Sequence, residues 1–201
     1  MKLYTSEAPN PFRVKVFLRE KGIEIPTQMI NIMDGETRQP DFLRINSLAE
    51  VPVLELNDGS YLTESVAICR FLETQHPTPA LLGTSKLEVA RVDMWNRRME
   101  QQIMTPIGEV ARHTFGLFAD RFEQVQAYAD TQMRLQLKRW AWLDQELADG
   151  RTYVCEDEFS IADITGMAAL KICGYVGQDV PAELVHARRW EQAVKSRASW
   201  H

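Results

Sequence analysis

The first part of the chain alternates short apolar-rich runs with a helical pattern. Residues 2–5 and 28–32 form two such runs, and the segment between them has apolar residues at helical spacing. Two strands separated by a helix pair in parallel, so residues 2–32 predict a βαβ unit. The helix is predicted to begin at Asn10–Pro11, because Asn is a favoured N-cap and Pro suits the first helical position. Lys21–Gly22 is typical of a helix C-terminus.

A second pattern predicts a hairpin followed by a helix. Val53–Leu56 is a short apolar-rich strand, Asn57-Asp58-Gly59 tolerates positive φ in a tight turn, and Tyr61–Leu62 begins the return strand. An amphipathic helix then starts at Glu64–Ser65. With a short helix at 41–45, the order is βαβ, helix, ββα, which matches a thioredoxin-like α/β domain.

The composition changes near residue 80. All but two of the nine prolines precede that position, whereas all five tryptophans follow it. Beyond it, apolar residues recur at helical spacing, Pro106 predicts a kink or break, and no alternating strand pattern occurs. The chain is therefore predicted to contain an α/β domain at 1–77, a linker at 78–85 and an all-helical domain at 86–201.

Within the helical domain, the segment FSIADI is typical of a helix start. Ser160 is placed to cap the helix and Asp163 to reach back to the Ser160 N–H, while Phe159 and Ile164 occupy the positions of a hydrophobic staple. We interpret this segment as a folding device for a buried helix that extends to about Ile172. We assign it no chemistry.

Composition and motifs argue against several classes of function. The net charge of −5 disfavours non-specific binding to nucleic acids or anionic membranes, and no apolar run approaches the ~20 residues that span a bilayer. Three unpatterned cysteines and the lack of a signal-peptide pattern favour a reducing cytoplasm. The four histidines share no metal-ligand spacing, so no metal is expected. No Gly-rich phosphate loop or G-x-S-x-G motif occurs.

Val51–Pro52 and Glu64–Ser65 are the main candidates for a binding site. We expect a cis peptide bond at Val51–Pro52, which would turn the N–H and C=O groups of Val51 toward a ligand. The first turn of the following helix has unpaired N–H groups that attract a carboxylate, and Glu64 is suited to hold an ammonium. Such a site fits a small peptide that ends in a free α-amino acid. The alternative interpretation is an ordinary helix start with an acidic residue.

Four stretches, in this order and at these distances, resemble glutathione transferases: MKLYTSEAPNPFRVKVFLREKGI, GETRQPDFLRINSLAEVPVLEL, VPVLELNDGSYLTESVAICRFLE and EFSIADIT. The resemblance covers essentially the whole chain. It implies a thioredoxin-like domain that binds glutathione as a co-substrate through Val51, Pro52, Glu64 and Ser65. Gln39 is a candidate for contact with the glycine carboxylate, in a loop where many family members carry Lys or His.

The residue that holds the glutathione sulfur as a thiolate is left open between Asn10 and Ser6. A thioredoxin-type cysteine is absent, since the predicted helix start reads Ala8-Pro9-Asn10-Pro11. Tyr4 and Ser6 lie farther ahead of the helix than the catalytic residues of the tyrosine and serine types. PNPFRV instead resembles the Pro-Asn stretch of bacterial nu-type transferases, in which an asparagine or threonine near the thiol replaces the usual hydroxyl. For Asn10, a plain N-cap is the alternative.

The resemblance implies a bacterial cytosolic glutathione transferase that acts in detoxification. Its second substrate would be a small hydrophobic electrophile, in a pocket between the start of the first helix and the first long helix of the helical domain. The expected lining residues are Phe12, Met104, Ile107, Ala111, His113 and Phe115. Two alternatives stay open: a glutathione-dependent disulfide or peroxide reductase without a protein cysteine, and a non-catalytic regulatory or binding protein.

A homodimer is expected, with no nucleic-acid or membrane partner. The family resemblance implies it, and the first long helix is apolar around more than one face, which requires a second neighbour. The residues that carry this argument are Val89, Val92, Trp95, Met99 and Ile103.

Overall fold

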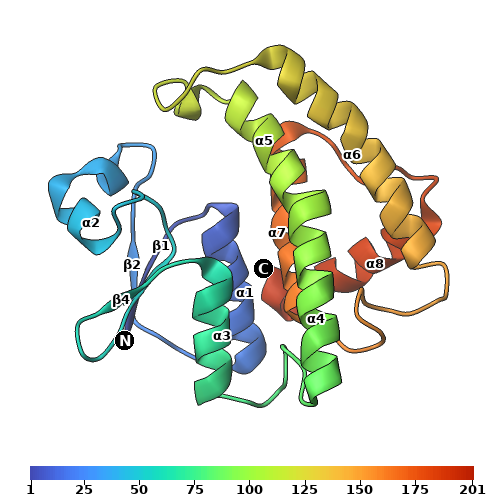
Figure 1. The fold of residues 1–201 in the computed structure, drawn as a ribbon, viewed down its shortest axis with the longest axis horizontal. Coiled ribbons are helices and arrows are strands. Elements are labelled where there is room, and N and C mark those ends of the chain that lie inside the picture. The colour runs from blue at the N-terminus through green and yellow to red at the C-terminus, as the bar shows by residue number, and fades with distance from the viewer. The chain divides into compact units, whose positions relative to one another are not determined.

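The computed structural model describes residues 1–201 as two compact units, Met1–Ala80 and Leu81–His201. The first is an α/β unit around a four-stranded sheet, and the second consists of helices (Figure 1). The predicted fold class, a thioredoxin-like domain followed by an all-helical domain, is confirmed.

The sheet of the first unit has the strand order β2-β1-β3-β4. Its strands are β1 (Lys2–Thr5), β2 (Thr27–Met29), β3 (Val53–Glu55) and β4 (Tyr61–Leu62). β1 pairs in parallel with β2 and antiparallel with β3, which forms the predicted hairpin with β4. The strand predicted at 28–32 ends early, because Asn31 turns the chain: its Oδ1 accepts the N–H groups of Met33 and Asp34.

Three α-helices and a short 3-10 helix, η1 (Glu36–Arg38), complete this unit. The α-helices are α1 (Pro9–Lys21), α2 (Pro40–Ile45) and α3 (Ser65–Gln75). The predicted start of α1 is wrong by two residues. The N-cap is Ala8 and Pro9 takes the first helical position, so Asn10 lies inside the first turn and does not cap the helix. The N–H groups of a first turn have no intrahelical acceptor, so proline fits at position 9 as well as at position 11.

Buried side chains cover both faces of the sheet. Successive residues of β1 face opposite sides of the sheet. Tyr4 packs with Phe42 of α2 and with Val53 on one side. Leu3, on the other side, is fully buried, as are Val14 and Phe17 of α1, the helix that packs beside α3 (Figure 1). This packing holds β1 and β3 in place, and with them the segments after β1 and before β3 that contribute to the candidate site.

The second unit contains five α-helices and a π-helical segment. They are α4 (Lys86–Arg98), the π-helix η2 (Met99–Met104), α5 (Thr105–Thr114), α6 (Gln126–Glu146), α7 (Ile161–Val176) and α8 (Val185–Lys195). Pro106 produces no break: it occupies the second position of α5, directly after the π-helix. A proline cannot donate the α-helical bond to the residue four positions back, and the wider π-helical turns accommodate that loss.

The predicted capping box at the start of α7 is present. Asp163 is fully buried, and its Oδ2 accepts hydrogen bonds from the N–H (3.0 Å) and Oγ (3.2 Å) of Ser160. Its Oδ1 accepts from the Val154 N–H at 3.0 Å and from the Trp190 Nε1 at 2.9 Å. Burial raises the pKa of the Asp163 carboxyl, against the opposing effect of these four bonds. The helix continues beyond Ile172 to Val176.

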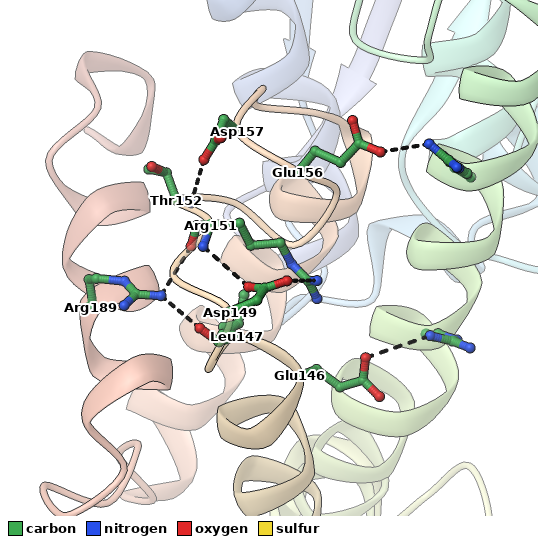
Figure 2. Close-up of polar contacts among 10 residues, drawn as sticks. Glu146, Leu147, Asp149, Arg151, Thr152, Glu156, Asp157 and Arg189 are labelled. Carbon is green, nitrogen blue, oxygen red and sulfur yellow. Dashed lines mark hydrogen bonds and ion pairs between the residues drawn. The ribbon is translucent and has the colours of Figure 1, made fainter.

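Charged contacts attach the loop between α6 and α7 to its neighbours within the helical unit (Figure 2). The Nη2 of Arg189, on α8, donates to the carbonyls of Leu147 (2.8 Å) and Arg151 (3.1 Å). On the other side, the Nη1 of Arg91, on α4, lies 2.8 Å from a carboxylate oxygen of Glu156. The loop is thus held from two helices. None of the helices combines the length and apolarity needed to cross a bilayer.

Candidate functional site

A small cleft in the α/β unit brings together five of the thirteen predicted site residues. It is formed where the start of α1, the turn before β3 and the start of α3 converge. The lining residues are Asn10, Asn46, Glu50, Val51, Pro52, Glu64 and Ser65. Five of these, all except Asn46 and Glu50, were singled out from the sequence.

Val51 presents its backbone polar groups without a partner. The Val51–Pro52 bond is cis, as predicted. Val51 lies in the turn between α2 and β3, outside both elements. Its N–H and C=O groups make no hydrogen bond within the chain. The turn around it is fixed by Asn46, whose Nδ2 donates to the Glu50 carbonyl at 2.8 Å and whose Oδ1 accepts from the Leu48 N–H at 3.1 Å. The orphan groups of Val51 are therefore held in a defined place.

The start of α3 is left open. Its N-cap is Glu64, with φ 65° and ψ 113°, and no side chain caps the helix. The first bond of the helix runs from the Ile68 N–H to the Glu64 carbonyl at 2.9 Å, so the N–H groups of residues 65–67 have no partner in the chain. Positive φ is unusual for a residue other than glycine, and such conformations cluster at functional sites. The Glu64 side chain is exposed beside these donors.

Behind this helix start lies a residue that the sequence analysis missed. Arg13 of α1 is only 1% exposed, and its Nη1 donates to the Oγ of Ser65 at 3.0 Å. An available signal was its spacing: Arg13 stands four residues before the buried Phe17 and therefore on the apolar face of the helix. The site thus includes a buried cation.

Asn10 and Ser6, the two catalytic candidates, lie in different environments. Asn10 is exposed in the first turn of α1, and its side-chain amide has no hydrogen-bond partner in the chain, so it is free to face a ligand in the cleft. Ser6 is 3% exposed and does not line the cleft; its Oγ accepts from the Ala8 N–H at 3.2 Å. The Tyr4 hydroxyl donates to Glu55 at 2.9 Å. Of these side chains, Asn10 alone reaches the cleft.

The remaining predicted residues lie outside this cleft. Gln39 is exposed at the start of α2 and is not among the lining residues. Of the predicted electrophile-pocket residues, Phe12, Met104, Ile107 and Ala111 are buried, whereas His113 and Phe115 are partly exposed. The His113 Nδ1 accepts from the Val125 N–H at 3.0 Å.

No thiol of the chain is poised to react. Cys69, Cys155 and Cys173 are free and buried, and burial raises the pKa of the Cys69 and Cys173 thiols to about 12. Cys69 therefore packs in the core, as its apolar helix position indicates. No group of three or more His, Cys, Asp or Glu side chains could hold a metal ion. The chemistry available at the cleft is hydrogen bonding and charge.

Comparison with known proteins shows the family to which the chain belongs. The family models of the glutathione S-transferase N-terminal and C-terminal domains match residues 8–75 and 101–198. Glutathione S-transferase 2 of Saccharomyces cerevisiae is 34% identical over 203 residues, which cover 97% of this chain and 85% of that protein. The chain belongs to the glutathione S-transferase family.

Solved structures give the same result. A glutathione S-transferase domain-containing protein from Marinobacter aquaeolei superposes with a TM-score of 0.93 at 33% identity, covering all of both chains. Gtt2 from Saccharomyces cerevisiae superposes with a TM-score of 0.92 at 33% identity, covering 100% of this chain and 98% of that one.

Proposed function

We propose that the cleft of the α/β unit binds glutathione, and that the protein activates its thiol for attack on a small hydrophobic electrophile. The observation that carries this proposal is the set of unpaired groups around the cleft. They are the Val51 backbone, the Glu64 carboxylate and the N–H groups of residues 65–67. Other helices of the chain, such as α6 and α8, also begin without a side-chain cap, so the support comes from the convergence of these different unpaired groups on one cleft.

These groups match the functional groups of glutathione in kind. The cysteinyl backbone would pair with the N–H and C=O of Val51, as a short added strand. The γ-glutamyl α-carboxylate would lie at the N-terminus of α3, where Ser65 and the free N–H groups can donate to it. Its ammonium would pair with Glu64. Gln39 remains the candidate for the glycine carboxylate.

Activation of the thiol is a modest energetic task. A thiol of pKa near 8.5 is only a few per cent ionised at neutral pH, and lowering that pKa by about 2 requires about 2.7 kcal/mol. We assign this task to the Asn10 amide, as a hydrogen-bond donor, and to the N-terminal end of α1, as the positive end of the helix dipole. The thiolate sulfur would then bond to the electrophilic carbon as the leaving group departs with its electron pair.

The most direct test of this site compares two exposed glutamates of the same unit. Glu64→Ala should weaken glutathione binding by 1.5 to 3 kcal/mol, roughly 10- to 150-fold in Kd, because the ammonium loses a charged partner. Glu24→Ala removes an exposed carboxylate that does not line the cleft and serves as the matched control. Calorimetric titration measures both. Equal affinities for glutathione in the two variants would place the ligand elsewhere.

The reaction type is a separate question, with two other candidates. A disulfide or peroxide reductase would use the same thiolate without a protein cysteine, and a non-catalytic protein would use the cleft for binding alone. Purified protein should be assayed with glutathione against an aryl halide, an organic peroxide and a mixed disulfide. We expect turnover of the aryl halide, and turnover of only the peroxide or disulfide would assign the reductase function instead.

We also propose a homodimer in a reducing cytoplasm. Of the five apolar residues that motivated a dimer, Val92, Trp95, Met99 and Ile103 are buried in the single chain, so only Val89 supports the original argument. The helix instead exposes Leu87 (61%) and Met94 (41%). Sedimentation showing only a species of 23.1 kDa at micromolar concentration would reject the dimer.

A further inference from the structure

A buried arginine lies directly behind the proposed carboxylate site. Arg13 of α1 is 1% exposed, Ser65 of α3 is 4% exposed, and the Arg13 Nη1 donates to the Ser65 Oγ at 3.0 Å. A cation is costly to bury, and apolar residues of similar volume often replace buried ions without loss of stability. The guanidinium is hydrogen-bonded to a residue that lines the cleft, which connects it to the site.

Arg13 determines how the Ser65 hydroxyl can hydrogen-bond. A hydroxyl offers one donor and two acceptor positions, whereas a guanidinium only donates. Because the Ser65 Oγ accepts from Arg13, its own proton must point elsewhere. That proton is donated to no other group of the chain, and Ser65 lines the cleft. It is available to an acceptor on a ligand.

We propose that Arg13 is a positioning residue that commits Ser65 to donate to an anionic group at the N-terminus of α3. The inference rests on the proposed function and names what this end of the cleft selects, a carboxylate rather than a carboxamide. A carboxylate only accepts, and so matches the Ser65 hydroxyl and the N–H groups of residues 65–67. A carboxamide has an NH2 group in place of one oxygen, and this group donates hydrogen bonds. Opposite the Ser65 hydroxyl and these N–H groups it would find no acceptor. The adjacent guanidinium also polarises the hydroxyl and strengthens its donation.

The test compares two ligands that differ only at this end. They are glutathione and its analogue in which the γ-glutamyl α-carboxylate is a carboxamide. Calorimetry should show that the wild-type protein prefers glutathione by about tenfold or more, the range expected for hydrogen bonds to a charged group. Arg13→Met should weaken glutathione binding by about tenfold and leave the affinity for the carboxamide analogue nearly unchanged. The ratio of the two affinities should therefore fall. Arg19→Met, at an exposed position of the same helix, is the matched control and should keep the preference.

A double-mutant cycle separates a role through Ser65 from a general one. In Ser65→Ala, the further change Arg13→Met should have little additional effect on glutathione affinity, because the group that Arg13 positions is gone. The proposal would be overturned if Arg13→Met lowered the glutathione affinity equally in the wild-type and Ser65→Ala backgrounds. It would also be overturned if Arg13→Met kept the wild-type preference for glutathione over the analogue. A purely structural residue would lower the affinity for both ligands alike.

Two further results keep the outcomes distinct. If Arg13→Met does not fold by circular dichroism, Arg13→Lys replaces it; this variant keeps a buried cation and should show an intermediate preference. Failure of both to fold would assign Arg13 to packing and overturn the proposal. Wild-type protein that binds neither ligand would instead overturn the proposed function, whereas binding without any preference would remove only the role of Arg13.

Discussion

Two helix starts in this molecule have opposite designs. At α7, the side chains of Ser160 and Asp163 satisfy each other and the neighbouring backbone, and Asp163 alone accepts four hydrogen bonds in full burial. At α3, the side chain of the N-cap residue Glu64 accepts no hydrogen bond from the helix, the first N–H groups are unpaired, and the helix start lines a cleft. Both begin with a serine near an acidic residue. The two starts therefore differ in whether their polar groups are paired within the chain and not in residue type, and on the proposed function this difference distinguishes a folding device from a binding site.

Arg13 adds to this contrast. The four bonds at Asp163 close its site, whereas the bond from Arg13 to Ser65 leaves the hydroxyl proton free on the cleft side. Asp163 completes a hydrogen-bond network within the chain, whereas Arg13 orients the Ser65 hydroxyl as a donor toward the cleft. Mutations at the two helix starts should therefore have different consequences.

The largest expected effect is on stability, at α7. Asp163→Ala leaves the Trp190 Nε1 and the N–H groups of Val154 and Ser160 buried without an acceptor. Each such group costs about 1–3 kcal/mol, so unfolding should become easier by about 3 kcal/mol or more. Thermal unfolding followed by circular dichroism should show Tm lower by at least about 6 °C for a chain of this size. Glu64→Ala should change stability by at most about 0.5 kcal/mol. Equal losses in the two variants would remove the distinction between the helix starts.

The next effect is on activity, at the start of α1. Because Asn10 does not cap the helix, Asn10→Asp should leave the fold intact, and an acidic residue in the first turn is favourable. The change removes a donor to the thiolate and adds a negative charge beside it, which raises the pKa of the bound thiol. Activity at pH 7 should fall roughly tenfold or more, with part of it returning as pH rises toward 9.

Asn10→Ser is the control for that experiment, since a hydroxyl still donates. It should retain most of the activity and the wild-type pH profile. Wild-type activity of Asn10→Asp at pH 7 would show that another group holds the thiolate. Ser6 and the backbone N–H groups at the start of α1 would then be examined.

The smallest effect is expected at a third helix start, that of α4. The Glu88 carboxylate accepts hydrogen bonds from the Thr84 hydroxyl and from the N–H groups of Thr84 (2.9 Å) and Ser85 (3.1 Å). These bonds, that from the hydroxyl first, lower its pKa to about 2. A folded pKa below the unfolded value of about 4.5 stabilises the fold above pH 4.5, and this contribution is lost as pH falls toward 2. The Tm difference between wild type and Glu88→Gln should therefore shrink over that range. A difference that stays constant with pH would contradict the assignment.

The local elements of the α/β unit were largely predictable from the sequence. The β3–β4 hairpin and the start of α3 follow from turn residues and periodicity, which act over a few residues. The capping box at α7 is equally local, and its prediction is confirmed. At α1, both prolines fit a first turn, so the sequence leaves the helix start ambiguous and makes Asn10 a candidate N-cap, a position that Ala8 occupies in the structure.

The features that were missed depend on contacts between distant segments. The bond between Arg13 and Ser65 joins residues 52 positions apart, and no local pattern specifies it. The π-helix at Met99–Met104 packs against α7, and sequence periodicity around Pro106 predicted only a kink or break there. Which polar groups remain unpaired at the cleft likewise becomes visible only when α1, β3 and α3 are assembled.

The central claim, that the open helix start and Val51 form the glutathione site, is tested most directly by NMR. In a 15N-labelled sample titrated with glutathione, the backbone amide signals of Val51 and residues 65–67 should shift in a saturable manner. The backbone amide signals of Ser160 and Asp163 should not shift, because these N–H groups already donate to acceptors within the chain. Saturable shifts confined to residues outside the cleft, or no shifts at millimolar glutathione, would contradict the account.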